Sequence, residues 1–328
     1  MTAVANDFDF VVDAIEKNYA GFPSKVIDLR VSEYVSLKAS LRDAYLSTED
    51  PKECEDLLRA FLAFFNDKHI SIQANGKTAG EAGAFKQKPF FERIDGDTAL
   101  ICIPSFLPEN YEAINNLIQE HHEVLTNTTN LVIDLRGNGG GSDDCFNALL
   151  PYVCPGSIEV VGADVRATQG NIEYLNELTK VHEFPEEALL QIKSLTGLMS
   201  ESLGSFVEMV PTQTVELANV FAIPQKVAIC VDKGCASSTE QFLIFAIQSP
   251  KTILFGETTA GCIDFSNVVS APTPSNNWIL SYPISRSKRI PFNQIDGHGI
   301  EPHFRMDTES KELINDVVKQ LHSNVGSS

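Results

Sequence analysis

The sequence has few of the features that mark a nucleic-acid-binding, membrane-spanning or disulfide-stabilised protein. It carries 25 Lys and Arg residues against 44 Asp and Glu residues, which gives a formal net charge of −19, and it contains no run of basic residues. A protein of this charge would repel the phosphate backbone of a nucleic acid. The seven cysteines are odd in number and include no C-x-x-C pair, so they encode neither a disulfide framework nor a zinc motif. No apolar run approaches the ~18 residues that a membrane span needs. We therefore expect neither nucleic-acid nor membrane partners.

The N-terminus also lacks the basic start and apolar stretch of a signal peptide. We therefore expect a cytoplasmic protein, or an exported one if a leader preceded the given sequence. The 328 residues, 43% of them hydrophobic, are enough to bury a substantial core.

Two kinds of periodicity divide the chain. Residues 7–19, 31–46 and 51–66 have apolar residues at helical spacing, which predicts a helical N-terminal domain over residues 1–75. From about residue 97, strand-like and helix-like segments alternate, which predicts an α/β core over residues 76–328 with a sheet covered on both faces. The strand-like segments are "TALICIPSF", "NLVIDLRG", "KVAICVD" and "KTILFGE", and the helical ones are 109–126, 143–153 and 237–248. A partly helical insertion at about 157–222 could cap a site or be an ordinary surface insertion.

"LVIDLRGNGGGSDD" is the most distinctive stretch, because a buried strand runs into four glycines between Gly137 and Gly141. Such a loop can present backbone N–H groups to a phosphate or to a tetrahedral oxyanion. It can also simply make a tight turn between a strand and a helix. No phosphate-loop motif matches in the right frame.

Ser237 in "GCASSTEQF" allows two interpretations. Followed by Glu240, it has the form of a helix capping box, and the local pattern by itself favours the cap. It also stands at the start of a predicted helix, where free N–H groups favour negative charge, as a nucleophile requires. A serine nucleophile further needs a base. Among the seven histidines, His69, His298 and His303 are the candidates, because each stands in a loop or at a strand edge.

Taken together, these stretches resemble the C-terminal processing (tail-specific) protease family, and most closely its branch with the tricorn protease core and the interphotoreceptor retinoid-binding protein modules. The resemblance covers most of the chain and rests on "DFDFVVDAIEKNYAGF", "FFNDKHISI", "VIDLRGNGGG", "CASSTEQF" and "LFGETTAG". It implies a crotonase/ClpP-like β-β-α core sheet and serine peptidase activity.

The resemblance also implies roles for individual residues. Ser237 matches the nucleophile, His69 the general base, and Asp296 the carboxylate that orients the base. Glu301 or His298 could replace Asp296 from the same loop. The implied acyl transfer requires no metal or organic cofactor. The stretch "NQIDGHGIEPHF" offers ligand atoms for a metal but matches no known metal-binding spacing.

The oxyanion hole implied by the family consists of a backbone N–H of Gly140 or Gly141 together with that of Ser238. Two positions depart from the family. Cys262 stands where the processing branch has its catalytic lysine, so a serine–lysine mechanism is excluded at that position. Lys68 stands where the tricorn-like branch has a serine directly before its histidine.

The expected substrate is a short or unfolded peptide, hydrolysed through an acyl-enzyme. The 28 residues between His69 and "TALICIPSF" leave no room for a PDZ domain, so a peptide would instead add to a strand edge. Two alternatives stay open: an inactive binding module of the same fold, and a crotonase-type acyl-CoA enzyme, which would need a basic site for the CoA phosphates. The sequence specifies neither the oligomeric state nor the residues preferred around the cleaved bond.

Overall fold

The computed structural model describes residues 6–76, 88–181 and 184–323 and divides into two compact units. Unit 1 comprises Met1–Ala82, Val161–Thr212 and Asp264–Asn293, and unit 2 comprises Gly83–Val160, Gln213–Ile263 and Gln294–Ser328. These units differ from the predicted domains of residues 1–75 and 76–328, because most of the 157–222 insertion joins the N-terminal helices. Strand β12 (Trp278–Ser287) is the reason, since it pairs both with β1 (Ser71–Ala74) and with β6 (Ala163–Arg166).

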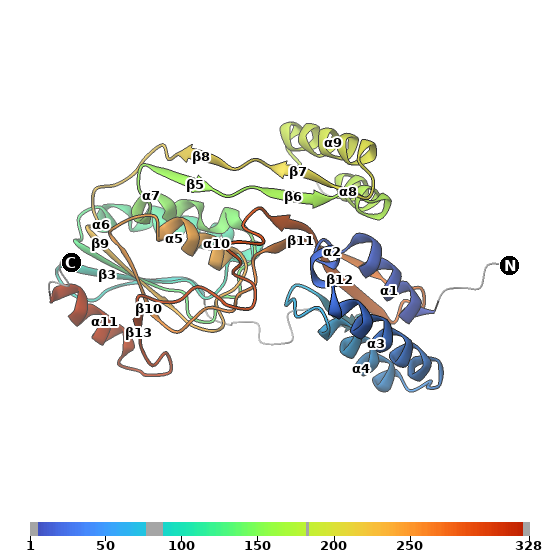
Figure 1. Ribbon diagram of the computed structural model, residues 1–328. Coiled ribbons are helices and arrows are strands. Elements are labelled where there is room, and N and C mark those ends of the chain that lie inside the picture. The colour runs from blue at the N-terminus through green and yellow to red at the C-terminus, as the bar shows by residue number, and fades with distance from the viewer. Residues whose placement is uncertain (1–5, 77–87, 182–183, 324–328) are drawn as a thin grey trace. The chain divides into compact units, whose positions relative to one another are not determined.

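The helices predicted at the N-terminus are confirmed in unit 1 (Figure 1). Their bounds are α1 (Asp7–Asn18), α3 (Leu29–Leu46) and α4 (Pro51–Ala63), and the short α2 (Phe22–Lys25) was not predicted. Local chemistry sets the starts of two of them. Asn6 caps α1 through the N–H of Asp9, and Asp50 caps α4 through two N–H groups, with Pro51 in the first helical position.

The sheet of unit 1 is antiparallel and has the order β1-β12-β6-β7, with β11 (Phe265–Pro272) paired to β12. The remaining elements of this unit are β7 (Phe206–Val210), α8 (Gln169–Val181) and α9 (Glu186–Glu201). An aromatic core joins helices to sheet, and its fully or almost fully buried members include Phe8, Tyr19, Phe61, Phe65 and Phe265. The segment that follows α4 and carries His69 is thus anchored on a packed core.

The sheet of unit 2 has the order β13-β10-β9-β4-β3-β2, and every pair is parallel except β2 with β3. Its strands are β2 (Phe90–Arg93), β3 (Thr98–Cys102), β4 (Asn130–Asp134), β9 (Lys226–Val231), β10 (Thr252–Gly256) and β13 (Phe304–Arg305). The four strands predicted from the sequence are therefore confirmed, as is the α/β class.

Helices cover both faces of this sheet, as its continuous apolar strands predict. Alternate residues of β4 enter different cores: Ile133 packs with α5 (Tyr111–Glu120) and α10 (Ser238–Ala246), and Val132 packs with α11 (Leu313–His322). Figure 1 shows α11 on the opposite side of the sheet from α5 and α10. The smaller elements are η2 (Pro108–Asn110), α6 (His122–Leu125), η3 (Asp143–Leu149), α7 (Leu150–Val153) and the paired strands β5 (Ser157–Val160) and β8 (Gln213–Glu216).

The order of the strands places the candidate site. Because β4 and β9 are adjacent and parallel, the loops that follow them leave from the same edge of the sheet. One is the glycine loop, and the other leads to Ser237. Among the described residues, no helix is both long and apolar enough to cross a bilayer.

Candidate active site

The glycine loop packs directly against the turn that carries Ser237. A Cβ atom added to Gly140 would lie 2.6 Å from the carbonyl oxygen of Ala236, 2.8 Å from the nitrogen of Ser238 and 2.9 Å from Cβ of Ser237. Gly140 also has a φ of +91°, which side chains disfavour. Only glycine therefore allows the two loops to approach this closely, and the structure brings four of the predicted site residues together within unit 2: Gly140, Gly141, Ser237 and Ser238.

Ser237 does not cap helix α10. Its side chain makes no capping hydrogen bond, and its backbone has φ 56° and ψ −124°. Its N–H donates to the carbonyl oxygen of Cys262 at 2.9 Å. A positive φ is a strained conformation for a residue with a side chain, and such strain concentrates at functional sites. The capping-box interpretation is therefore wrong for this serine.

Two backbone N–H groups beside Ser237 are available to a ligand. In the described part of the chain, neither the N–H of Gly141 nor that of Ser238 donates a hydrogen bond. The N–H of Gly140, in contrast, donates to Oδ1 of Asn138 at 3.0 Å. Gly141 is exposed, whereas Gly140 is buried. Of the two predicted glycine donors, this geometry favours Gly141.

Glu240 forms hydrogen bonds with the segment 259–262, which in turn contacts the backbone of Ser237. Its side chain is fully buried, and Oε1 accepts hydrogen bonds from Oγ1 of Thr259 at 2.5 Å and from the N–H of Gly261 at 2.8 Å. Oε2 accepts from the N–H of Cys262 at 2.7 Å. Since the carbonyl oxygen of Cys262 binds the N–H of Ser237, Glu240 supports the serine backbone through this segment.

Asp296 also belongs to unit 2 and is 5% exposed, with Oδ1 accepting a hydrogen bond from the N–H of Ile263 at 2.7 Å. The alternatives in the same loop are engaged differently. Glu301 lies on the surface and pairs with Arg305 at 3.2 Å, and Nδ1 of His298 lies 3.2 Å from the carbonyl oxygen of Asp296. Nδ1 of His303 accepts from the N–H of Leu254. Burial therefore favours Asp296 over Glu301 as the carboxylate predicted to orient the general base.

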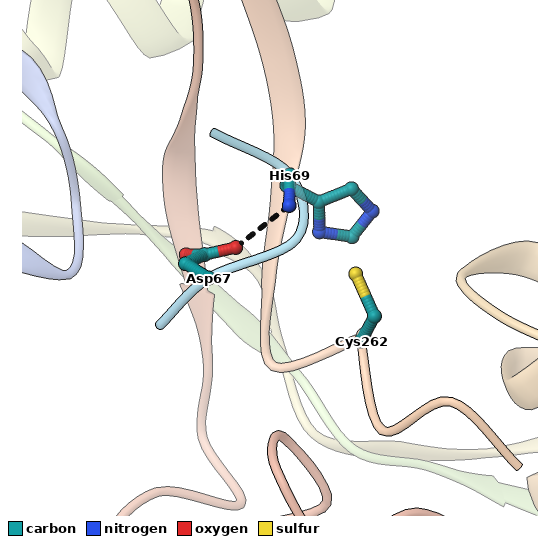
Figure 2. Close-up of side chains that lie close together, drawn as sticks. All are labelled: Asp67, His69 and Cys262. Atoms are coloured by element: carbon teal, nitrogen blue, oxygen red, sulfur yellow. Dashed lines mark hydrogen bonds between the residues drawn. The ribbon is translucent and has the colours of Figure 1, made fainter. Parts of the chain in front are cut away.

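His69 belongs to unit 1, where the side chain of Asp67 holds its backbone (Figure 2). Oδ1 of Asp67 accepts from the N–H of His69 at 2.9 Å, and Oδ2 accepts from the Tyr19 hydroxyl at 2.6 Å. Nζ of Lys25 lies 4.0 Å from the same carboxylate. Both oxygens of this buried carboxylate are thus engaged, and Asp67 positions the turn that carries the histidine.

Sequence reasoning missed three buried polar residues of these loops as supports: Asp67, Asn138 and Glu240. Each stands within three residues of a predicted site residue, so the sequence shows that it belongs to the same motif. Their hydrogen-bond partners were not visible, because these partners include residues 19 and 106 and the segment 259–262, all distant in the sequence.

Tyr19→Phe is expected to lower the free energy of unfolding by about 1.5 to 3 kcal/mol, because it removes a hydrogen bond to a buried carboxylate. Urea titration followed by circular dichroism measures the change. Tyr174→Phe in the same unit is the control, since the Tyr174 hydroxyl makes no hydrogen bond within the described residues, and it should shift stability by less than about 0.5 kcal/mol. Equal effects of the two substitutions would contradict a supporting role for the Tyr19–Asp67 bond.

Comparison with known proteins identifies the family. The model of peptidase family S41 matches residues 97–306, which is more than half of the chain. The chain therefore belongs to peptidase family S41, and the resemblance inferred from the sequence is confirmed. It is a serine-type peptidase, with a peptide or a protein as substrate.

Solved structures share the fold over almost the whole chain. A candidate peptidase of Parabacteroides merdae has a TM-score of 0.64 at 13% identity, covering 100% of this chain and 98% of its own. Mature CPAF has a TM-score of 0.64 at 14% identity and 98% coverage of both chains. The tricorn protease has a TM-score of 0.54 at 9% identity, covering 97% of this chain and 36% of its own. No curated protein matches the sequence.

Proposed function

We propose that this peptidase cleaves short or unfolded peptides through an acyl-enzyme formed on Ser237. The observation that carries the proposal is the conformation of Ser237, which does not cap its helix and lies beside the uncommitted N–H groups of Gly141 and Ser238. A nucleophile held against two free donors is the arrangement that acyl transfer requires.

The reaction proceeds in two halves. His69 takes the proton of the Ser237 hydroxyl, and Oγ attacks the carbonyl carbon of the substrate. The N–H groups of Gly141 and Ser238 stabilise the negative charge on the tetrahedral oxygen. His69 then returns the proton to the leaving amine, the C–N bond breaks, and water hydrolyses the acyl-enzyme by the same steps.

Asp296 is proposed as the carboxylate that orients His69. Asp67, the acidic residue of the "FFNDKHISI" stretch, accepts a hydrogen bond from the N–H of His69 and so supports the main chain of the base. Asp296 is buried, is carried by a different loop, and stands where the family resemblance implies the orienting carboxylate.

Charge near the glycine loop favours a peptidase over an acyl-CoA enzyme. Asp143 and Asp144 follow Gly141 and Ser142 directly, and both residues are exposed. These carboxyl groups would repel the phosphates of CoA, whereas a peptide backbone carries no such charge.

The test is covalent labelling with a fluorophosphonate, followed by intact-mass analysis and peptide mapping. We expect one adduct on wild-type protein, located at Ser237, and none on Ser237→Ala or His69→Ala. A small and a bulky fluorophosphonate should be compared, so that restricted access is separated from lack of reactivity. A folded wild-type protein that neither reagent labels would favour the inactive binding module instead, and an adduct that persists in Ser237→Ala would assign the nucleophile elsewhere.

A further inference from the structure

Asn138 is the most highly connected polar side chain of the glycine loop. It is completely buried, and its Oδ1 accepts three hydrogen bonds: from the N–H of Phe106 at 3.2 Å, from the N–H of Gly140 at 3.0 Å and from Oγ1 of Thr239 at 2.9 Å. Its Nδ2 donates to the carbonyl oxygen of Ile103 at 3.0 Å. All five residues belong to unit 2.

These bonds join three segments that are distant in the sequence. Ile103 and Phe106 lie in the chain leaving β3, Gly140 is in the loop after β4, and Thr239 is in the first turn of α10. The backbone of Asn138 adds a fifth hydrogen bond, since its carbonyl oxygen accepts from the N–H of Ala236 at 3.2 Å. A single buried side chain thus sets how the glycine loop lies against the Ser237 turn.

The bonds also decide which N–H groups remain for a substrate. By engaging the N–H of Gly140, Asn138 leaves the next one along the loop, that of Gly141, as the uncommitted donor. By binding Thr239, it holds the helical turn that begins with Ser238, the second uncommitted donor. The carbonyl oxygen of Gly141 in turn accepts from Oγ of Ser238 at 2.9 Å, which ties the two donor residues together.

We propose that Asn138 is the positioning residue of the oxyanion hole, setting the separation and direction of the Gly141 and Ser238 N–H groups. This inference rests on the proposed function, because Asn138 would position the oxyanion hole of the same peptidase site. The residue type matters, since an aspartate would lose the bond to Ile103 and bury a charge, and an aliphatic side chain would leave three donors unsatisfied.

The experiment measures acylation by p-nitrophenyl acetate, which is small enough to need no peptide subsites, alongside the rate of fluorophosphonate labelling. Asn138→Ala should lower the saturating acylation rate about 100-fold, the scale of losing an oxyanion donor, and leave the half-saturating concentration within about twofold of wild type. Fluorophosphonate labelling should slow in parallel. Thr239→Val removes one of the four side-chain bonds with little change of shape and should slow acylation about threefold to tenfold.

Asn130→Ala is the matched control, because Asn130 is also a buried asparagine but stands at the opposite end of β4, where Nδ2 donates to Oγ1 of Thr98. It should change acylation less than twofold even where it lowers the melting temperature as much as Asn138→Ala does. If Asn138→Ala does not fold, Thr239→Val provides the test. It should lower the saturating acylation rate and leave the half-saturating concentration unchanged. Near-wild-type acylation by a folded Asn138→Ala protein, or equal losses in Asn130→Ala, would overturn the proposal. A wild-type protein that is never acylated at Ser237 would instead reject the proposed function, and the oxyanion hole with it.

Discussion

Ser237→Ala is expected to lower the maximal rate of peptide hydrolysis by about 10⁴-fold to 10⁶-fold, because no acyl-enzyme can form without the hydroxyl. The rate is measured by following cleavage of fluorescein-labelled casein as an unfolded substrate. His69→Ala should cause a loss of similar size, and the double variant should be little worse than either single one, since the two groups act as a unit. Losses that multiply in the double variant would contradict the shared proton transfer.

The strained backbone of Ser237 predicts a difference in stability between two inactive variants, Ser237→Gly and Ser237→Ala. Ser237 has a φ of 56°, which glycine adopts without strain and alanine does not. Ser237→Gly is therefore expected to be inactive but to exceed Ser237→Ala in free energy of unfolding by about 1 kcal/mol. Urea titration of both variants checks this difference. A glycine variant less stable than the alanine variant would show that the turn is not strained in solution.

Glu240→Gln is expected to lower both the stability of the protein and its rate of acylation. Both carboxylate oxygens accept hydrogen bonds from backbone N–H groups, Oε1 from Gly261 and Oε2 from Cys262, so an amide must place its NH₂ against at least one of these donors. Because the site is fully buried, the free energy of unfolding should fall by about 2 to 3 kcal/mol. Acylation by p-nitrophenyl acetate should also slow at least about tenfold, since Cys262 holds the N–H of Ser237.

Glu301→Gln is the control for this substitution. The side chain of Glu301 is 74% exposed and forms a salt bridge with Arg305, four residues later in the sequence. An exposed salt bridge of this kind contributes little to stability. We expect a change of less than about 0.5 kcal/mol and wild-type acylation. Should Glu240→Gln behave like Glu301→Gln, the buried carboxylate would not support the serine.

Local patterns in the sequence were enough to predict the elements that carry the site. Helices α1, α3 and α4 follow from apolar residues at helical spacing, and strands β3, β4, β9 and β10 from apolar runs that end in turn residues. The glycine loop was recognisable for the same reason, since four glycines directly after a strand are visible without knowing any partner.

The two units could not be predicted in this way. Strand β12 pairs with β1, more than 200 residues earlier, and with β6, more than 110 residues earlier, so no short window of sequence contains the interaction. The helical domain predicted over residues 1–75 therefore shares its sheet with two later segments of the chain.

The sequence by itself determined which residues could do chemistry: a serine before a helix, a glycine loop after a parallel strand, and a histidine after α4. Only the tertiary structure decided which hydrogen-bond partners surround the serine and the glycine loop. Ser237 and Glu240 have the spacing of a capping box, yet Glu240 binds Thr259, Gly261 and Cys262 instead. Gly140 and Gly141 look equivalent in sequence, yet Asn138 engages only the first. The physical reason is that a buried polar group must find hydrogen-bond partners, and which partners are within reach depends on segments that only folding brings together.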